Sequence, residues 1–383
     1  MGGDLRLRRL RLRNWRNFTS IEVAIPDRLY LIGPNASGKS NFLDVFRFLR
    51  DLAAPGGGFQ QAVSRRGGVS TIRCLAARRQ SVVEIGVELT EGKAGIQWNY
   101  ELGLHQDQQR RPVVCMERVL RDCVELIKRP DEQDYADPER LTQTSLEQVN
   151  ANRTFRELSA FFASIRYLHI VPQLIRDPDR TGGGLNDPFG GDFLEQVAGV
   201  QERTRNARLR RIGKALQMAV PQLEAIDLWR DSRGTPHLRG KYRHWRPQGA
   251  WQTEEQFSDG TLRLIGLFWS AMEKEGPLLL EEPELSLHPG MVRALPKMLA
   301  RVQRRTGRQT LLSTHSPELL RDKRIGLQQT LVIIPGMEGA QAIPLESNGK
   351  ARQLLESGFS LAEDLTSGVG PEQAGQRPLF GEE

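Results

Sequence analysis

The sequence lacks any run of about 18 apolar residues, which is the length that a helix needs to cross a membrane. Its opening stretch, MGGDLRLRRLRLRNW, also lacks an apolar segment of the signal-peptide type and instead alternates Leu with Arg. Both absences argue against a chain that is inserted into or exported across a membrane. We therefore expect a cytoplasmic protein with no membrane partner.

Cysteine is scarce, with only Cys74, Cys115 and Cys123 in 383 residues. Their odd number and wide spacing argue against a disulfide framework. Cys115 and Cys123 also lack the close paired spacing of a zinc site. We expect all three to be ordinary reduced thiols.

Coiled-coil heptads and internal repeats are absent as well, which excludes long helical arms and repeat architectures. The charge is unbalanced: the net charge is +7, and the excess is mostly arginine. Such a surplus permits binding to a polyanion without establishing it.

What the sequence does contain is an alternation of strands and helices. LRLRRLRLRNW and SIEVAI alternate apolar with polar residues, which predicts a β-meander. SNFLDVFRFLRDL predicts an amphipathic helix whose apolar face consists of Phe42, Val45, Phe46, Leu49 and Leu52. The later strands PLLLEE and QTLLST are apolar throughout, which is typical of a buried parallel sheet. The predicted fold class is α/β.

Changes in composition divide the chain into five predicted segments. An N-terminal lobe with the β-meander and a Gly-rich loop spans 1–112, and a polar insertion of helices and a loop spans 113–160. A strand, a helical subdomain and a basic hairpin follow at 161–250. A second lobe spans 251–345, and a tail of flexible composition spans 346–383.

The stretch GPNASGKS, Gly33 to Ser40, fits the pattern G-x-x-x-x-G-K-[ST] and lies between a predicted strand and a predicted helix. The glycines let backbone amides curl around phosphate oxygens, and the helix N-terminus adds positive potential. Lys39 is expected to reach the β- and γ-phosphates of a nucleotide, and Ser40 to bind Mg²⁺. The alternative is a chance match at a Gly-rich turn, which the flanking strand and helix disfavour.

The apolar strand PLLLEE ends in two carboxylates, Glu281 and Glu282. Ligands bind at the carboxyl ends of parallel strands, so both acids are expected beside the nucleotide. Neighbouring residues of a strand face opposite ways, which gives the two acids separate roles. Glu281 is predicted to hold the Mg²⁺ shell, and Glu282 to polarise or deprotonate the attacking water. A solvated acidic turn is the alternative.

Two further motifs are weaker when taken alone. His315 in LLSTHSPELL follows another apolar strand, where it would sense the γ-phosphate or merely cap a helix. FSDGT places Ser258 and Asp259 before an apolar helix, the pattern of an N-cap.

The order of NWRNF, GPNASGKS, FSDGTLR, LLLEEPELSLHP and STHSP resembles the ABC-type AAA ATPases of the RecF, SMC and OLD kind. The chain is most similar to stand-alone ATPases of bacterial anti-phage systems. The resemblance covers about Leu5 to Leu320, apart from the insertion, and implies an ABC-ATPase head. Such a head has a P-loop core with a parallel sheet, an antiparallel β subdomain and a helical signature subdomain.

The resemblance also implies roles for single residues. FSDGT would be the signature motif, in which Ser258 and Gly260 contact the γ-phosphate held by a second subunit. Gln173 resembles the Q-loop glutamine that joins the metal site, although a plain loop Gln stays open as the alternative. His288 is expected to be a structural cap. The implied catalytic residues are Glu282, His315 and Lys39; the nucleotide-binding residues are Gly33, Asn35, Ser37, Gly38, Lys39, Ser40, Asn41, Ser258 and Gly260; and the metal-site residues are Ser40, Glu281 and Gln173.

The implied cofactors are ATP and Mg²⁺, and the implied assembly is an ATP-sandwich homodimer or a larger oligomer.

The sequence departs from the family in reading Ser-Asp-Gly for Ser-Gly-Gly and Glu-Glu for Asp-Glu, as the OLD-like branch does. The short, loop-rich segment after Ser316 leaves no room for a Toprim nuclease, so a separate effector protein is expected. A slow ATP-dependent scaffold, a RecF-like DNA-repair ATPase and, least favoured, a transporter ATPase are the alternatives.

Two basic segments bear on nucleic-acid binding. RLRRLRLRNWR carries several arginines, and RGKYRHWR mixes cations with Tyr242 and Trp245. Cations beside aromatic rings suit phosphate contact and base stacking. The alternative, slightly favoured at each site, is a solvated basic edge that discourages sheet aggregation. DNA or RNA binding therefore stays open.

Overall fold

A computed structural model describes residues 5–78, 80–92, 95–176, 187–243, 250–273 and 276–347. It forms two compact units, the first made of Met1–Ala163 with Thr314–Glu383 and the second of Ser164–Ser313. The expectations for Trp245, for Arg246 and for the tail beyond residue 347 lie outside the described residues. No helix in the described part of the chain is long and apolar enough to cross a membrane.

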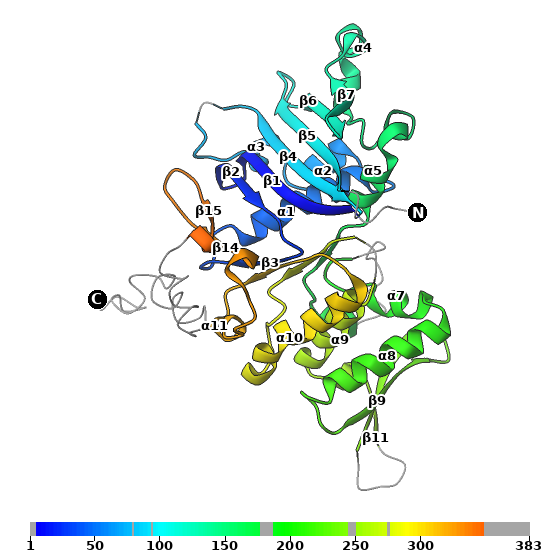
Figure 1. Ribbon diagram of the computed structural model, residues 1–383. Coiled ribbons are helices and arrows are strands. Elements are labelled where there is room, and N and C mark those ends of the chain that lie inside the picture. Colours follow the sequence, from blue (N-terminus) through cyan, green and yellow to red (C-terminus); the bar gives the residue numbers. More distant parts are fainter. Residues whose placement is uncertain are drawn as a thin grey trace, which may run out of the picture. The chain divides into compact units, whose positions relative to one another are not determined.

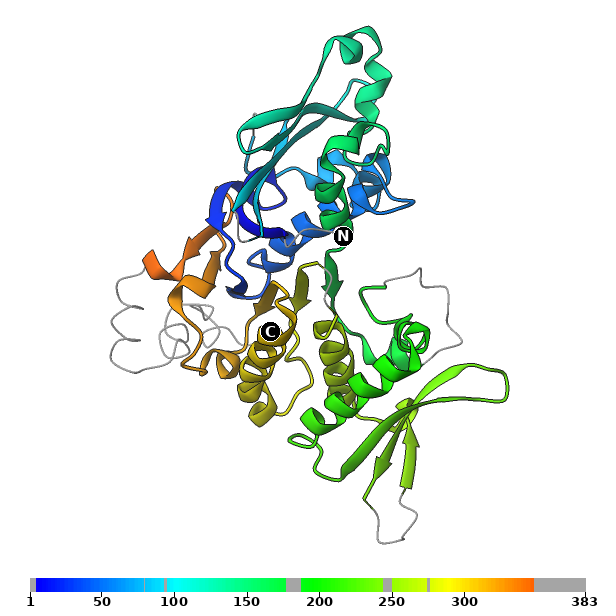
Figure 2. The same cartoon turned by 45° about the vertical axis from the view of Figure 1, so that its right-hand side comes forward.

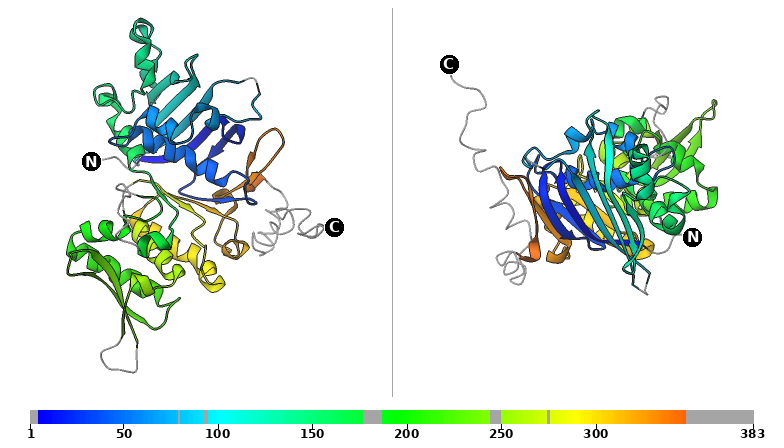
Figure 3. Two further views of the ribbon diagram at one scale, coloured as in Figure 1. Left: turned by 180° about the vertical axis from the view of Figure 1, so that it is seen from behind. Right: turned by 90° about the horizontal axis from the view of Figure 1, so that it is seen from above.

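The first unit contains an antiparallel sheet in the order β2-β1-β4-β5-β6-β7, seen side by side in Figure 3. Its strands are β1 (Leu5–Trp15), β2 (Phe18–Ala24), β4 (Val83–Glu91), β5 (Ile96–Gln106), β6 (Pro112–Arg121) and β7 (Val124–Arg129). The predicted meander is present, and β1 buries its leucines while most of its arginines face outward. The double Arg8–Arg9 interrupts the alternation, and the pairing register with β4 shifts between Leu7 and Arg9 to absorb the extra residue.

The helices and loop predicted for 113–160 begin only after two strands, β6 and β7. The charged composition concealed these strands because some of their charges are buried in pairs. Glu117 is fully buried, and its carboxylate lies 3.3 Å from the Arg129 guanidinium, which also meets Asp134 at 2.8 Å. The segment then continues through α4 (Glu132–Ala136), η1 (Pro138–Thr142), η2 (Ala151–Phe155) and α5 (Arg156–Ala163).

Helices α1 (Lys39–Ala53) and α5 pack on the inner face of this sheet. The predicted apolar face of α1 is buried along its whole length. Trp15 of β1 lies 5.4 Å from Phe48 of α1 between ring centroids, and Tyr100 of β5 lies 5.6 Å from Phe162 of α5. These two ring pairs lie in the core between the sheet and its helices. Burial of each such aromatic side chain contributes about 1.5–3 kcal/mol to the free energy of unfolding.

The remaining strands of the first unit are β3 (Arg28–Ile32), β14 (Thr330–Ile334) and β15 (Gln341–Pro344). β14 pairs in parallel with β3 and antiparallel with β15. Both late strands lie in the stretch after Ser316, where a short, loop-rich segment was expected. Short helices complete the unit: α2 (Phe59–Ser64), α3 (Val69–Ile72), α11 (Pro317–Leu320), η5 (Leu327–Gln329) and η6 (Leu345–Ser347).

The second unit holds the parallel strands β8 (Arg166–Leu168), β12 (Leu278–Glu281) and β13 (Thr310–Thr314), with β12 between the other two. Its longer helices are α8 (Glu202–Leu216), α9 (Asp259–Ala271) and α10 (Pro289–Thr306), as labelled in Figure 1. Shorter ones are α6 (Pro172–Arg176), α7 (Phe193–Gly199) and η4 (Glu254–Gln256). The helical stretch predicted from Phe193 to Val220 is broken between α7 and α8.

The predicted hairpin of the second unit gains a third strand. β9 (Leu223–Arg230) and β10 (Pro236–Tyr242) pair as expected, and β11 (Ala250–Thr253) extends the sheet beside β10. Figure 2 shows α8 lying along this sheet. Phe257, which precedes α9, is buried against Tyr242 of β10, so the sheet and the start of α9 share a core.

Glu147 carries the one strong pH dependence of stability that we predict. Its carboxylate accepts hydrogen bonds from the backbone amides of Phe59 and Thr144, and burial raises its pKa to about 7. Since the folded state then binds more protons between about pH 4.5 and 7, the free energy of unfolding falls as pH rises through that window. With a discount for its partial exposure, the loss is about 1–2 kcal/mol.

Glu147→Gln should lack this fall in stability. Denaturant unfolding of both proteins at pH 5 and pH 8 measures it, and each protein at pH 5 is its own reference. An equal pH dependence in wild type and variant contradicts the prediction.

Candidate functional site

The Gly-rich loop of the first unit connects the end of β3 to the start of α1. Gly38 has a φ of 111° and Ala36 a φ of 61°, so the chain passes twice through left-handed backbone conformations. A Cβ atom on Gly33 would lie 2.4 Å from the Ile333 carbonyl oxygen and 2.7 Å from Ser37 Oγ. The loop is therefore too tightly wound to admit a side chain at Gly33, and at Gly38 the backbone itself requires glycine.

Hydrogen-bond donors gather inside this loop. Helix α1 begins without a side-chain cap and without an acidic residue in its first turn, so its N-terminal amides are offered to the loop. Lys39 is 6% exposed, and its Nζ donates to the carbonyls of Gly33 and Pro34 at 2.8 and 2.9 Å. Ser37 Oγ is buried and has no partner among the described residues. An orphaned hydroxyl, a buried ammonium and an uncapped helix together fit a phosphate group.

The other loop residues predicted to bind nucleotide are Asn35, Ser40 and Asn41. Asn35 and Ser40 are exposed at the loop surface, and Ser40 occupies the first turn of α1. Asn41 Nδ2 donates to Asn17 Oδ1 at 2.9 Å, so it contacts another part of the protein.

Asn17 is a supporting residue that the sequence reading did not single out. Its Nδ2 donates to the carbonyl of Ser37 at 2.8 Å, and Trp15 Nε1 donates to the carbonyl of Asn41 at 3.0 Å. The turn between β1 and β2 thus holds the loop from outside. These residues belong to NWRNF, which carried the family resemblance without a role of its own.

We predict that Asn17→Ala weakens nucleotide binding about three- to tenfold, because two hydrogen bonds that fix the loop are lost at about 1 kcal/mol or less each. Fluorescence titration with a labelled ATP analogue measures the change. Ser20→Ala, at an exposed position on the strand β2 that follows this turn, is the matched control and should bind as wild type does. Equal affinity in the two variants would contradict the bracing role.

The acidic pair of the second unit lies at the end of β12. Glu281 accepts a hydrogen bond from the Tyr167 hydroxyl, and its carbonyl lies 3.3 Å from His169 Nδ1. Glu282 falls just outside the strand with a φ of 43°, and its amide donates to the carbonyl of Ser313 at 3.0 Å. The two acids were expected to point apart because neighbouring strand residues face opposite ways. Glu282 instead lies beyond the strand, and its left-handed backbone conformation sets its direction. Glutamate is uncommon in that conformation, which costs of order 1 kcal/mol or more.

The FSDGT stretch forms the start of α9. Ser258 is its N-cap, and its Oγ accepts from the Thr261 amide at 3.3 Å, so the predicted cap is confirmed. Ser258 is nevertheless exposed. A Cβ on Gly260 would lie 2.9 Å from the Ser286 carbonyl oxygen, so the backbone here approaches its neighbour too closely for a side chain.

The predicted Q-loop residue is linked to this same stretch. Gln173 lies in α6, and its Nε2 donates to Asp259 Oδ2 at 3.4 Å. Arg176, one turn later, donates from Nη2 to Asp259 Oδ1 at 2.5 Å and to the Phe257 carbonyl at 2.7 Å. Arg176 could not be singled out from the sequence, and Asp259 was considered only as a possible cap, because their pairing joins residues far apart in the chain.

A further cation lies near the acidic groups of the second unit. Burial lowers the pKa of Arg263 on α9, while the carboxylates of Asp259 and Glu282 oppose that shift. Asp259 and Glu282 therefore both act electrostatically on one guanidinium. Arg263 is part of FSDGTLR, but the sequence reading attached no role to it.

The two candidate histidines differ in what surrounds them. His288 Nδ1 accepts from the Gly290 amide at 3.2 Å and caps α10, as expected. His315 is exposed between β13 and α11. The loop residues and His315 belong to the first unit, whereas Gln173, Ser258, Gly260, Glu281 and Glu282 belong to the second.

Within the ranges that the structure describes, no group of three or more His, Cys, Asp or Glu side chains could hold a metal ion. Three groups are predicted to bind Mg²⁺: the Ser40 hydroxyl, the Glu281 carboxylate and the Gln173 amide oxygen. All three are oxygen ligands of the kind that Mg²⁺ prefers.

The basic segments are largely neutralised by their neighbours. On the N-terminal strands Arg9 lies 2.6 Å from Glu22, and Arg8 lies 3.3 Å from Asp27. On the three-stranded sheet Arg239 lies 3.0 Å from Asp227 and stacks on Trp251, and Lys241 lies 3.5 Å from Glu224. Cations that already face carboxylates favour the solvated-edge interpretation over a nucleic-acid surface.

The chain matches a known protein family in sequence and solved structures in fold. Residues 29–321 match the protein family described as "AAA domain, putative AbiEii toxin, Type IV TA system". None of the curated proteins compared with the chain is similar in sequence.

Two solved structures share the fold. An SMC head bound to the C-winged helix domain of ScpA has a TM-score of 0.55 and 12% identity, covering 91% of this chain and 99% of that one. An SMC head with an extended coiled coil, bound to the C-terminal domain of ScpA derived from Pyrococcus furiosus, has a TM-score of 0.53 and 11% identity, covering 92% and 99%. The predicted ABC-ATPase head fold is thereby confirmed, as is the mixed α/β class.

Proposed function

Because the chain belongs to the AbiEii-type family of AAA domains, we propose that it binds and hydrolyses ATP in a sandwich of two copies and thereby regulates a separate effector. The observation that carries the proposal is the loop from Gly33 to Gly38 together with the start of α1. The orphaned Ser37 hydroxyl in the loop, the buried Lys39 that begins α1 and the uncapped end of this helix are suited to the phosphates of a nucleotide.

The proposed chemistry assigns a task to each group. Lys39 and the loop amides hold the β- and γ-phosphates, and Ser40 with Glu281 holds the Mg²⁺ shell, Gln173 joining it from α6. When bound, Mg²⁺ neutralises charge on the phosphate oxygens. Glu282 accepts the proton of the attacking water, and His315 donates a hydrogen bond to the γ-phosphate.

The second copy is proposed to close the site. Ser258 and Gly260 lie at the N-terminus of α9, and Ser258 is exposed. A helix N-terminus favours a negatively charged group, so this one suits the γ-phosphate held by the other copy. ATP would then join two copies, and hydrolysis would release them.

The effector is proposed from the family and the fold. The family description names a toxin–antitoxin system, and the two SMC heads were solved with a ScpA domain bound. We propose a cytoplasmic role in anti-phage defence, in which the ATP state of this chain controls a partner protein.

The test uses the purified full chain with ATP and Mg²⁺. Phosphate release measures turnover, and sedimentation with and without ATP measures association. Turnover together with ATP-dependent dimerisation supports the proposal. Dimerisation without turnover indicates a scaffold that ATP holds closed, and the absence of both overturns the proposed function.

A further inference from the structure

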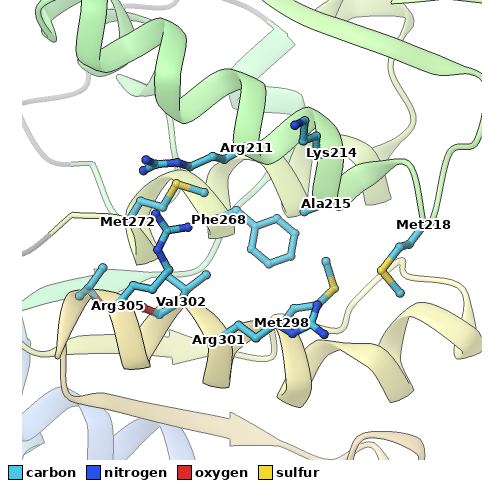
Figure 4. Close-up of a pocket in the computed structure, with 11 residues that line it drawn as sticks. Arg211, Lys214, Ala215, Met218, Phe268, Met272, Met298, Arg301, Val302 and Arg305 are labelled. Atoms are coloured by element: carbon cyan, nitrogen blue, oxygen red, sulfur yellow. Dashed lines mark hydrogen bonds between the residues drawn. The ribbon is translucent and has the colours of Figure 1, made fainter.

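Three helices of the second unit enclose a groove that shares no residue with the proposed ATP site. Figure 4 shows the residues that line it, which lie on α8, α9 and α10 or just beyond the ends of α8 and α9. The cavity has a volume of about 630 Å³. The lining residues are Arg211, Lys214, Ala215, Met218, Phe268, Met272, Met298, Arg301, Val302, Arg305 and Thr306.

The floor of the groove is apolar and adaptable. Phe268 of α9 and Met298 of α10 are buried beneath it, and Met272 and Met218 follow the ends of α9 and α8. Met218 is 63% exposed and adds apolar surface beside the cations of the rim. Unbranched methionines repack around different partners, and surfaces that bind helices use them for this purpose.

The rim of the groove is cationic. Arg211 and Lys214 line one wall and Arg301 and Arg305 the other, and all four are exposed. None of them forms an ion pair with any carboxylate that the structure describes. They differ in this from the arginines of the N-terminal strands and of the three-stranded sheet, which face acidic neighbours. Their charge is therefore available to an anionic partner.

The spacing of the lining residues fits a helix. Residues 298, 301, 302 and 305 follow the i, i+3, i+4, i+7 pattern along α10, and residues 211, 214 and 215 follow its first three positions along α8, with Met218 two residues beyond the end of that helix. Seven residues of helix span about 10 Å, so the α10 wall offers about two turns of contact. The cations recur at intervals of three or four residues, the interval at which a facing helix presents its own side chains.

We propose that this groove binds an acidic amphipathic helix of a partner protein. The apolar face of that helix would contact Met218 and Met272, and its Glu or Asp residues would meet the four cations. This inference rests on the proposed function for the existence of a separate effector, but docking itself needs no ATP. Single-stranded nucleic acid fits less well, because bases stack on exposed aromatic rings and Phe268 is only 1% exposed.

The probe is a fluorescein-labelled helical peptide with Leu at i, i+3, i+4 and i+7 and Glu at the flanking positions. Fluorescence anisotropy with the full chain, without nucleotide, measures its Kd. We expect this Kd to be at least about tenfold lower than that of the same peptide with every Glu replaced by Lys, and than that of a scrambled peptide. Equal binding of the three peptides would overturn the proposal.

Variants of the chain locate the binding. Arg301→Glu combined with Arg305→Glu should raise the Kd by about tenfold or more, and Met218→Asp should raise it as well. The matched control, Arg210→Glu combined with Arg304→Glu, makes the same charge change at exposed positions of α8 and α10 outside the groove. Its Kd should stay within about twofold of wild type once salt is constant. Because all these residues are exposed, thermal unfolding should be unchanged.

Other occupants are separate outcomes of the same assay. One such outcome is that a labelled single-stranded oligonucleotide binds more tightly and displaces the peptide. Another is that the chain self-associates and the groove variant abolishes this self-association. Either result would replace the proposed partner and overturn the inference. ATP turnover is measured in parallel on the groove variants. Groove-dependent peptide binding without turnover would leave the docking inference standing and remove the ATPase proposal, and turnover without peptide binding would do the reverse.

Discussion

Glu282→Gln is expected to lower the rate of ATP hydrolysis by about a hundredfold or more while leaving ATP binding intact. General-base catalysis contributes typically 10²–10⁴-fold, and Gln keeps the shape of the side chain but cannot accept the proton. The backbone of Glu282 already has a φ of 43°, and Gln occupies it at no greater cost. Steady-state phosphate release measures turnover, and a titration with labelled ATP measures binding.

A second substitution at the same position separates chemistry from backbone strain. Glu282→Gly also removes the carboxylate but relieves the left-handed conformation, so it should be about as inactive as Glu282→Gln and about 1 kcal/mol more stable to unfolding. If wild type and Glu282→Gln hydrolyse ATP equally slowly, the general-base role is wrong and the chain acts as a scaffold.

The sequence was sufficient where short-range pattern decides structure. The spacing of GPNASGKS located a tightly wound loop before a helix, and the apolar runs located β12 and β13. Each of these features depends on residues close together in the chain, so the local sequence alone is enough to predict it. The FSDGT stretch is similar, because a Ser followed by a helix is enough to predict the cap that Ser258 provides.

What the sequence did not disclose depends on partners far away in the chain. β6 was hidden because Glu117 is buried, and its burial makes sense only once Arg129 is seen beside it. Asn17 braces a loop 20 residues away in sequence, and Arg176 meets Asp259 at a separation of 83. Such pairings leave no periodicity to read. The groove is a further case. Its four cations differ from the other basic residues only because they form no ion pair with a carboxylate that the structure describes, and a sequence does not show ion pairs.

The link between Arg176 and Asp259 changes how the signature stretch should be tested. Asp259 forms contacts with Arg176 and Gln173 within its own unit, whereas the side chain of Ser258 is exposed and is the one proposed to meet a second copy. A substitution at Asp259 would therefore disturb internal contacts as well as any contact with a second copy. Ser258 is the sharper target because its side chain is exposed.

Ser258→Arg is expected to abolish ATP-driven dimerisation and turnover while ATP still binds to the loop around Lys39. A long cation at the start of α9 would occupy the space of the γ-phosphate held by the other copy and remove the small hydroxyl that faces it. The lost cap itself costs only about 1 kcal/mol, too little to unfold a domain of this size. Sedimentation with ATP and phosphate release measure the two effects, and Lys39→Ala marks the signal of a chain that cannot bind ATP.

Ser258→Ala is the matched control, because it loses the same cap without adding bulk or charge. Its thermal unfolding should equal that of Ser258→Arg, while its ATP-dependent dimerisation should persist in weakened form. Greater loss in the Arg variant at equal stability would mean that the position meets a second copy. If Ser258→Arg still dimerises with ATP, Phe257 to Thr261 serves only α9, and the free amides of that helix end have no ligand beyond their own cap.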